Sequence, residues 1–301
     1  MTQVTGAKQI TRLPNTATAA QIFEVTQREG GCIVEQNLSP DLVQRLNEEL
    51  DPHLLDRDPL HGIENDEGMA AFCGRRTKRL CKLAIRSKSF PEYILEERLL
   101  EWVRLTLSPM CTEYQLGMSQ VIEIGPGEPS QYLHRDEVLF PRLANHTEDQ
   151  VLVNTMTALT DFDEENGATR VIPNTHKFPK IPAEQFDVEK DSLPAIMKAG
   201  DTLFWVGGLV HGGGANVSSN RFRRGLASQF SLGWLRSEEA HSLEITVEQA
   251  KALPPRLREL LGFAAYRTGG GYSYSVDMAD PYGVLFGEER PTPAPTADSF
   301  Y

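Results

Sequence analysis

Cysteine is scarce in this sequence, and none of it forms a recognisable motif. The four cysteines, Cys32, Cys73, Cys81 and Cys111, include no Cys-x-x-Cys pair, so neither a zinc knuckle nor a disulfide framework is indicated. The chain also lacks a run of about 18 apolar residues that could span a bilayer. Its polar start, residues 1–14, has no signal-peptide core. We therefore expect a cytoplasmic protein with reduced thiols that does not enter a membrane.

Basic residues are also few compared with acidic ones. The sequence has 30 Lys and Arg against 42 Asp and Glu, which gives a formal net charge of −12 and a pI near 5.1. Binding to nucleic acid or to an anionic membrane needs a basic surface, so a small or neutral substrate fits better. One basic run without acids extends from Arg75 to Lys88. We interpret it as a solvated strand face with one arginine turned inward.

The hydrophobic pattern is helical in the first third of the chain and strand-like in the middle. Caps such as Thr18, with Gln21 three residues later, mark helix starts. The expected helices cover residues 18–29, 39–52, 90–107 and 245–263. Short apolar runs between turn residues predict strands at residues 32–34, 118–124, 151–159, 169–172, 195–198, 202–206 and 222–232. This order predicts a β-sandwich or barrel supported by helices.

Three further segments carry specific expectations. Residues 55–74 mix Asp, Gly, Pro and Glu with few periodic apolar positions, as expected of a long loop that covers a site. Residues 195–206 are expected to form a hairpin around Ala199-Gly200-Asp201. The Gly-rich and then Pro-rich tail from residue 268 either docks on the body or packs on a second subunit.

The main candidate for a metal site is the segment of residues 131–136 (Gln-Tyr-Leu-His-Arg-Asp), together with His211 far downstream. Alternate residues of an extended strand share a face, so His134 and Asp136 would point the same way, and a later strand could bring His211 to them. Two imidazoles and one carboxylate on one face of an iron leave positions for a bidentate oxo-acid and for dioxygen. His176 is a competing third ligand, although it follows a Pro-Asn-Thr turn and is better suited to a structural role.

An oxo-acid such as 2-oxoglutarate would need a planar guanidinium for its distal carboxylate. Arg223 follows His211 closely and is expected on the neighbouring strand, while Arg221 would share its face and is the main competitor. The hydroxyl of Thr169 and the amide of Gln131 are candidate contacts near the keto acid. Either side chain could instead belong to ordinary strand structure.

Two other motifs fail on their context. His134-Arg-Asp resembles a kinase catalytic loop, but the asparagine expected five residues after Asp136 is Pro141, and no nucleotide loop accompanies it. The His211-Gly-Gly-Gly run resembles the oxyanion loop of esterases, yet no Gly-x-Ser-x-Gly follows it. A kinase and a hydrolase are therefore set aside. The glycines have a plainer use, because they let the backbone pass close to a metal and a substrate.

Five elements with chemical meaning occur together and in order. They are Gln131 with His134-x-Asp136, residues 165–169 (Glu-Asn-Gly-Ala-Thr), residues 173–176 (Pro-Asn-Thr-His), Gly200-Asp201, and His211-Gly-Gly-Gly with Arg223. Over residues 118–232 this set resembles the phytanoyl-CoA dioxygenase family. It is most similar to the natural-product branch, which includes cyclopeptin dioxygenase, verruculogen synthase and the fungal meroterpenoid dioxygenases. One departure is Asn174-Thr175-His176, where the family usually has Gly-Ser-His, and it affects a turn and no ligand.

The resemblance implies a mainly β protein with flanking helices and a double-stranded β-helix (jelly-roll, cupin-like) core. We expect one domain over residues 1–301, with a helical third at 1–110, the jelly-roll core at 111–235, and a helical and irregular part at 236–301. The resemblance also implies a homodimer whose partner helps to close the pocket.

The same resemblance implies the cofactors and their contacts. Fe(II) would be held by His134, Asp136 and His211. The cosubstrate 2-oxoglutarate would contact Arg223, and Thr169 and Gln131 would lie near it, with dioxygen as the second cosubstrate.

The function that follows is a dioxygenase that hydroxylates, desaturates, epoxidises or rearranges a mostly apolar small-molecule natural product of secondary metabolism. Halogenation is disfavoured, because Asp136 leaves no ligand position for chloride. One alternative is an acyl-CoA 2-hydroxylase of the phytanoyl-CoA type, in which the basic run from Arg75 would bind phosphates. Another is a catalytically silent metal-binding module. We expect no nucleic-acid or membrane partner.

Overall fold

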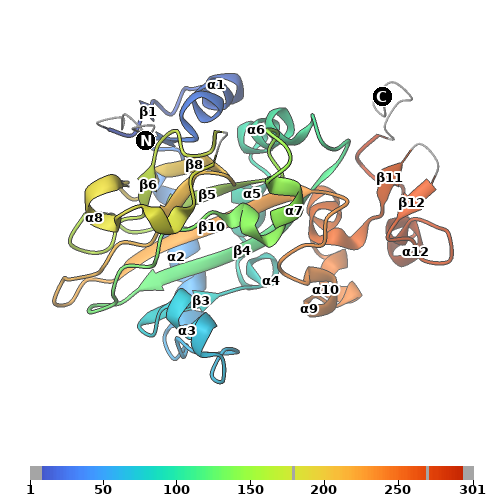
Figure 1. Ribbon diagram of the computed structural model, residues 1–301. Coiled ribbons are helices and arrows are strands. Elements are labelled where there is room, and N and C mark those ends of the chain that lie inside the picture. The colour runs from blue at the N-terminus through green and yellow to red at the C-terminus, as the bar shows by residue number, and fades with distance from the viewer. Residues whose placement is uncertain (1–8, 178–179, 269–270, 294–301) are drawn as a thin grey trace.

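The computed structural model describes residues 9–177, 180–268 and 271–293. Its centre is a seven-stranded sheet in the order β1-β2-β8-β5-β10-β4-β3, in which only the β1–β2 pair is parallel (Figure 1). The strands of this sheet are β1 (Arg12–Leu13), β2 (Gly31–Val34), β3 (Thr77–Leu80), β4 (Tyr114–Ile124), β5 (Leu152–Ala158), β8 (Thr202–Val206) and β10 (Arg223–Leu232).

A smaller sheet packs against one face of the large one. It has the order β7-β6-β9, and its strands are β7 (Leu193–Pro194), β6 (Arg170–Ile172) and β9 (Val210–Gly212). Val171 of this sheet belongs to the same apolar cluster as Met156 and Leu203 of the large sheet. The two sheets thus form the sandwich that the strand pattern predicts, and the space between them is available for a site.

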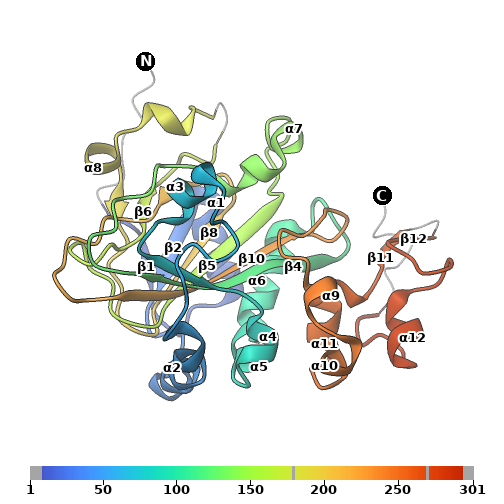
Figure 2. The ribbon, with the colours of Figure 1, turned by 90° about the horizontal axis from the view of Figure 1, so that it is seen from below.

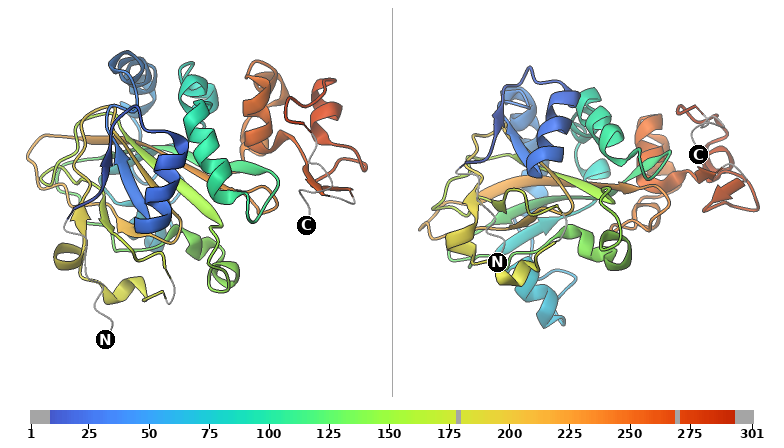
Figure 3. Two further views of the ribbon diagram at one scale, coloured as in Figure 1. Left: turned by 90° about the horizontal axis from the view of Figure 1, so that it is seen from above. Right: turned by 45° about the horizontal axis from the view of Figure 1, so that its top comes forward.

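Helices cover the other face of the large sheet. They are α1 (Ala19–Glu29), α2 (Pro40–Leu54), α4 (Leu83–Arg86), α5 (Phe90–Ile94) and α6 (Glu97–Leu107). Figures 2 and 3 show α2, α5 and α6 on one side of the sheet and the short helices α7 (Pro141–Ala144) and α8 (Val188–Asp191) on the other. The largest apolar cluster lies under the helices, where Trp102 meets the edge of Phe204 at a ring-centroid distance of 5.0 Å.

The expected helix at residues 18–29 is confirmed. The Thr18 hydroxyl accepts from the N–H of Gln21, whose side chain accepts from the Thr18 N–H, and Gly30 ends the helix at a φ of 90°. The helix expected to end near residue 52 is longer, because α2 continues through Pro52 to Leu54. The single helix expected at residues 90–107 is wrong, since Glu96 caps a new helix by accepting from the N–H of Leu99.

Two loop expectations are also corrected. Residues 195–206 form no hairpin. The strand expected at residues 195–198 is absent, and Met197 bridges Phe162 instead. The preceding strand β7 pairs with β6 in the small sheet, whereas β8 pairs with β2 and β5 in the large one. The chain therefore crosses between sheets at Gly200, whose φ is 96°. Residues 55–74 are not a continuous loop, because α3 (Glu67–Cys73) forms after Asp66 accepts from the N–H of Met69.

The C-terminal region forms a helical appendage at one end of the large sheet (Figure 1). The helix expected over residues 245–263 is divided in three, and the elements are α9 (His241–Glu244), α10 (Val247–Lys251), α11 (Pro255–Arg258), a π-helical turn (Glu259–Phe263), β11 (Tyr266–Thr268), β12 (Gly271–Ser273) and α12 (Pro281–Phe286). Part of the tail docks on the body, because Arg267 and Arg290 both pair with Glu113. Residues 269–270 and 294–301 of the tail lie outside the described residues. Within the described part of the chain, no helix combines the length and apolarity needed to cross a membrane.

Candidate active site

Two histidines from distant parts of the chain meet through their own backbones. The N–H of His134 donates to the carbonyl of His211 at 2.9 Å, and the N–H of His211 donates back at 3.0 Å. His211 lies on β9, but His134 belongs only to this isolated bridge, and Asp136 starts a short 3-10 helix (Asp136–Leu139). The expectation of a continuous strand through residues 134–136 is thus wrong. The extended backbone of Arg135, at φ −120° and ψ 137°, still puts its neighbours on one side.

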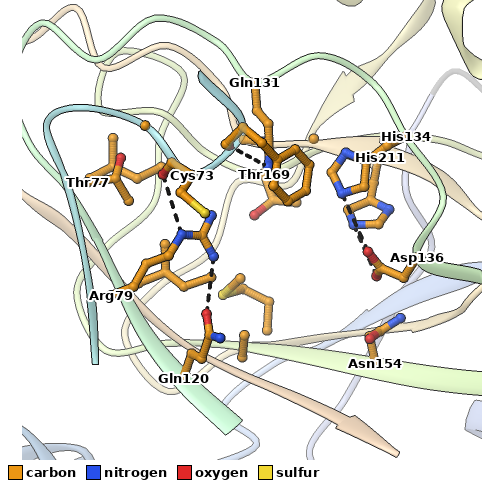
Figure 4. Close-up of a pocket in the computed structure, with 18 of the residues that line it drawn as sticks. Cys73, Thr77, Arg79, Gln120, Gln131, His134, Asp136, Asn154, Thr169 and His211 are labelled. Carbon is orange, nitrogen blue, oxygen red and sulfur yellow. Dashed lines mark hydrogen bonds and ion pairs between the residues drawn. The ribbon is translucent and has the colours of Figure 1, made fainter. Parts of the chain in front are cut away.

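The side chains of these residues form a compact donor set (Figure 4). Nε2 of His134 lies 3.4 Å from Oδ1 of Asp136, and Nε2 of His211 lies 3.4 Å from Oδ2. Each Nδ1 is 3.0 Å from a backbone carbonyl, that of Tyr132 and of Leu209 respectively. A carbonyl can only accept, so each Nδ1 carries the hydrogen and each Nε2 presents a lone pair.

Three lone-pair donors therefore converge with their ligand atoms within 4.8 Å of one another. Such an arrangement needs a cation between them, and two imidazole nitrogens with one carboxylate oxygen suit a divalent metal such as iron. Carbonyl acceptors behind both imidazoles fix the tautomer that a metal requires. The residues present therefore fit the expected metal.

The electrostatics agree with this donor set. Burial opposes ionisation of Asp136, but His211 and His134 outweigh it and lower the pKa of the carboxyl below its ordinary value. Burial lowers the pKa of His211, which keeps its imidazole neutral. An ionised carboxylate and a neutral imidazole are the protonation states that bind metal without proton release.

Arg223 enters the same cavity from the opposite sheet. It starts β10, its side chain is 1% exposed, and it donates to the hydroxyl of Thr169. Its guanidinium carbon lies 3.9 Å from the centre of the Phe162 ring. Burial, with a contribution from Arg79, lowers the pKa of Arg223 to about 9. Among the described residues no carboxylate pairs with this guanidinium, so it is a buried cation that can take an anionic ligand.

The competitor Arg221 lies elsewhere. Its guanidinium is 41% exposed and pairs with Asp163 and Glu165 on the surface. The register also corrects one expectation, since β10 pairs with β4 and β5 and is not a neighbour of β9. Arg223 reaches His211 across the sandwich, and not along one sheet.

Gln131 lies at the edge of the cavity, but backbone groups already engage its amide. Its Oε1 accepts from the N–H of Gly213 at 3.0 Å, and its Nε2 donates to the carbonyl of Phe72 at 3.0 Å. The side chain therefore ties the glycine run after His211 to helix α3 above the site.

His176 and Arg135 stay out of the metal centre. Nε2 of His176 lies 3.1 Å from the carbonyl of Gln27, and the Arg135 guanidinium donates to the carbonyls of Gly208 and Thr175. The Asn174 turn is also explained. Its φ of 68° is left-handed, a conformation that glycine adopts readily and asparagine tolerates.

The cavity around these groups holds about 1170 Å³ of space, including its open mouth. Apolar lining comes from Met69, Phe72, Met118, Ile122 and Met156, and polar lining comes from Arg79, Gln120, Asn154, Gln229 and Glu238.

Sequence reasoning missed two of these polar groups as site residues. Arg79 is the inward arginine of the basic run, and it donates to Oε1 of Gln120 at 3.2 Å. Alternation along β3 could have indicated it, because Thr77 and Arg79 share a face and both line the cavity. Asn154 could have been noted because its carboxamide directly follows the apolar run Val151 to Val153 in an expected strand.

Sequence comparisons place the chain among dioxygenases. A family model described as phytanoyl-CoA dioxygenase (PhyH) matches residues 26–225. Dioxygenase FrzG of a Cladobotryum species is 35% identical over 84% of this chain and 87% of its own length. Dioxygenase aneA of Aspergillus aculeatus is 32% identical, with coverage of 91% and 94%. The multifunctional dioxygenase prhA of Penicillium brasilianum is 33% identical, with coverage of 84% and 85%.

Solved structures agree on the fold. HygX from Streptomyces hygroscopicus, with nickel, 2-oxoglutarate and hygromycin B bound, has a TM-score of 0.55 at 17% identity, over 72% of this chain and 88% of HygX. The carbocyclase SnoK from nogalamycin biosynthesis, described as non-haem and α-ketoglutarate-dependent, has a TM-score of 0.52 at 16% identity, with coverage of 72% and 87%.

Proposed function

The chain belongs to the phytanoyl-CoA dioxygenase family, and we propose that it oxidises a mostly apolar small-molecule natural product in secondary metabolism. It is a non-haem iron, 2-oxoglutarate-dependent dioxygenase. The observation that supports the proposal most directly is the convergence of two imidazole Nε2 atoms on the Asp136 carboxylate, at 3.4 Å each. The same cavity holds Arg223, which pairs with no carboxylate among the described residues.

We assign the metal to His134, Asp136 and His211. When bound, iron with 2-oxoglutarate and dioxygen supplies an oxidant that removes hydrogen from a substrate C–H bond, while the oxo-acid becomes succinate and carbon dioxide. The residues contribute preorganisation, because carbonyl acceptors hold both imidazoles in the metal-binding tautomer. The apolar cavity wall keeps water away from the reacting carbon.

We assign the distal carboxylate of 2-oxoglutarate to Arg223 and Thr169. The guanidinium is buried and has no acidic partner among the described residues, so an entering carboxylate would neutralise it and accept two hydrogen bonds. Arg79 faces the same cavity and adds positive potential. Gln131 is proposed as a residue that shapes the cosubstrate end of the cavity through the Gly213 backbone.

The fold comparisons support a finer proposal about architecture. We propose that the seven-stranded and three-stranded sheets are the two halves of a double-stranded β-helix, and that residues 1–301 act as one domain. A homodimer and a cytoplasmic location are further proposals. Both can be checked directly, by light scattering on the purified protein and by imaging of a fluorescent fusion.

The basic run from Arg75 to Lys88 gives little support to the acyl-CoA alternative, because most of its side chains already have other partners. Arg75 pairs with Glu67, the amine of Lys78 donates to the carbonyl of Leu54, and Arg79 turns into the cavity. Few of its cations remain for CoA phosphates. The structurally similar carbocyclase SnoK, which belongs to nogalamycin biosynthesis, instead supports a natural product as substrate.

Succinate formation tests the function. The purified protein would be supplied with Fe(II), 2-oxoglutarate and a panel of fungal natural products, with acyl-CoA thioesters as the second arm. We expect substrate-dependent succinate with the first panel. Metal binding with no succinate from any compound would favour the silent module, and activity on acyl-CoA that is lost in Arg75→Ala with Arg76→Ala would favour the alternative enzyme.

A further inference from the structure

One buried amide of the large sheet has an N–H donor without an acceptor among the described residues. Asn154 lies on β5, is 2% exposed and lines the cavity. Its register partners are Gln229 on β10 and Trp205 on β8, so the three residues form one row across the sheet. A carboxamide in a strand whose every residue is buried has to be satisfied locally.

The donor atom of this amide is enclosed yet unpaired. Within the described part of the chain, Nδ2 of Asn154 has no hydrogen-bond acceptor, and Nε1 of Trp205 also has none. An enclosed N–H without an acceptor is costly, so such groups are usually completed by a ligand or by a change on ligand binding. Nδ2 is covered by neighbouring atoms and does not open to solvent. Its acceptor is therefore expected among the groups that already surround it.

Asp136 offers a complementary acceptor. The two imidazole Nε2 atoms lie 3.4 Å from its oxygens, and the hydrogen bonds of the described residues include no N–H or O–H donor to this carboxylate. If both Nε2 atoms held a metal, one carboxylate oxygen could bind that metal and the second could accept a hydrogen bond from a neighbouring donor. Carboxylate ligands of metals are normally hydrogen-bonded through their second oxygen.

Asn154 and Asp136 line the same cavity, and in the view of Figure 4 the amide of Asn154 lies toward the Asp136 carboxylate, on the side away from His134 and His211. We propose that Asn154 is a positioning residue whose Nδ2–H donates to the second oxygen of Asp136 when the metal is bound. This inference rests on the proposed metal site. The hydrogen bond fixes which oxygen faces the metal, and it satisfies the donor and the acceptor together.

The test measures metal binding without turnover. Mn(II) alone is titrated into the purified full-length protein and into the variants Asn154→Leu, Asn154→Asp and the control Gln229→Leu, which removes an amide from the same row. Loss of a hydrogen-bond partner of a metal ligand typically weakens metal affinity by about 10-fold to 100-fold. We expect that loss in Asn154→Leu and little change in Gln229→Leu.

A second readout separates positioning from general structure. Because Nδ2 is unpaired in the metal-free protein, Asn154→Leu should leave the melting temperature of that form unchanged or higher, while the rise on adding Mn(II) should shrink. The near-isosteric Asn154→Asp keeps the shape but faces Asp136 with a second carboxylate. Its carboxylate offers no N–H to Asp136, so its Mn(II) affinity should fall as in Asn154→Leu.

Three results would overturn the proposal. One is wild-type Mn(II) affinity in Asn154→Leu or Asn154→Asp. Another is a lower melting temperature of the metal-free Leu variant with an unchanged response to Mn(II). The third is loss of affinity in Trp205→Phe instead, which would make the indole the donor. Failure of the wild-type protein to bind Mn(II) would reject the metal site itself, and is thus distinguishable from failure of this inference.

Discussion

Arg223 and Arg224 are neighbours on β10, yet they lie on opposite faces of the large sheet and differ in their ion pairs. Arg224 points toward the helices, where it pairs with Glu123 and Asp51 and donates to Asn47. Arg223 points toward the small sheet, where a threonine hydroxyl is its hydrogen-bond partner. The helix-covered face satisfies its own charges, and the cavity face keeps a cation available.

Neutral polar groups repeat this contrast. Under the helices, the Tyr93 hydroxyl lies 3.1 Å from the hydroxyl of Thr155 and 3.3 Å from that of Ser228. On the cavity face, Nε of Arg223, Nδ2 of Asn154 and Nε1 of Trp205 have no acceptor among the described residues. Buried polar groups are normally paired. In this cavity, a ligand could supply the acceptors that these three donors lack.

The largest expected effect comes from removing the metal-binding carboxylate. Asp136→Ala should lower succinate formation by about 1000-fold or more, because a metal contributes several kcal/mol to the reaction. Mn(II) binding should be lost with it. The metal-free protein should also lose some stability at neutral pH, because the folded state lowers the pKa of this carboxyl and so favours its ionised form. Thermal unfolding with and without metal checks this, and retained Mn(II) binding would contradict the ligand assignment.

The adjacent arginines give the most direct test of the two faces. Arg223→Met should raise the KM for 2-oxoglutarate by about 100-fold, as expected for losing a charged, bidentate contact of about 3 kcal/mol. Metal-free stability should be kept or improved, because a buried cation without an acid is removed.

Arg224→Met is the matched control. It leaves the buried Glu123 without its cation and should cost about 3 kcal/mol of unfolding free energy, while the KM for 2-oxoglutarate stays near that of the wild type. Urea denaturation and steady-state kinetics measure both variants. If Arg223→Met instead lost stability and Arg224→Met instead raised the KM for 2-oxoglutarate, the proposed difference between the two faces of the sheet would be contradicted.

Acid should weaken metal binding on the cavity face. Burial lowers the pKa of His211 below its ordinary value of 6.5, so the neutral ligand is present at neutral pH and is lost only as the pH falls through that lowered pKa. We expect constant Mn(II) affinity from about pH 8 to pH 7, and roughly tenfold weakening per pH unit once the pH is below the lowered pKa of His211. Mn(II) titrations across this pH range test whether the pKa of His211 is lowered. An affinity that falls steadily from pH 8 would contradict the lowered pKa.

The smallest effect is expected for Arg221→Ala. This side chain is 41% exposed and pairs with surface acids, so its removal should cost less than about 1 kcal/mol of stability. The KM for 2-oxoglutarate should stay within about twofold. A large rise in KM would reinstate Arg221 as the cosubstrate arginine.

Hydrophobic periodicity and helix caps predicted those helices and strands that depend on residues close together in the sequence. The capping box of Thr18 and the strand runs that became β4, β5 and β10 depend on nearby residues, and they were placed within a few positions. Partners distant in the chain were not predictable in this way. The crossing at Gly200 resembles a hairpin in sequence, because only the pairing of β7 and β8 with different sheets distinguishes the two.

The site shows the same limit. The spacing of His134 and Asp136 indicated a shared face, although the strand assumed for it is absent. Arg223 was separated from Arg221 only by the packing of β10, since both were reasonable in sequence. Asn154 gave only a weak signal, because its role depends on a carboxylate from another segment.

The backbone bridge between residues 134 and 211 has a consequence for folding order. Contacts between residues this distant in sequence close a long loop, and they form after local helices and hairpins have already reduced the entropy of the chain. Two of the three proposed metal ligands, His134 and His211, are joined through this bridge. A nascent or partly unfolded chain would therefore bind iron poorly, and oxidant chemistry would be confined to molecules whose sandwich is complete.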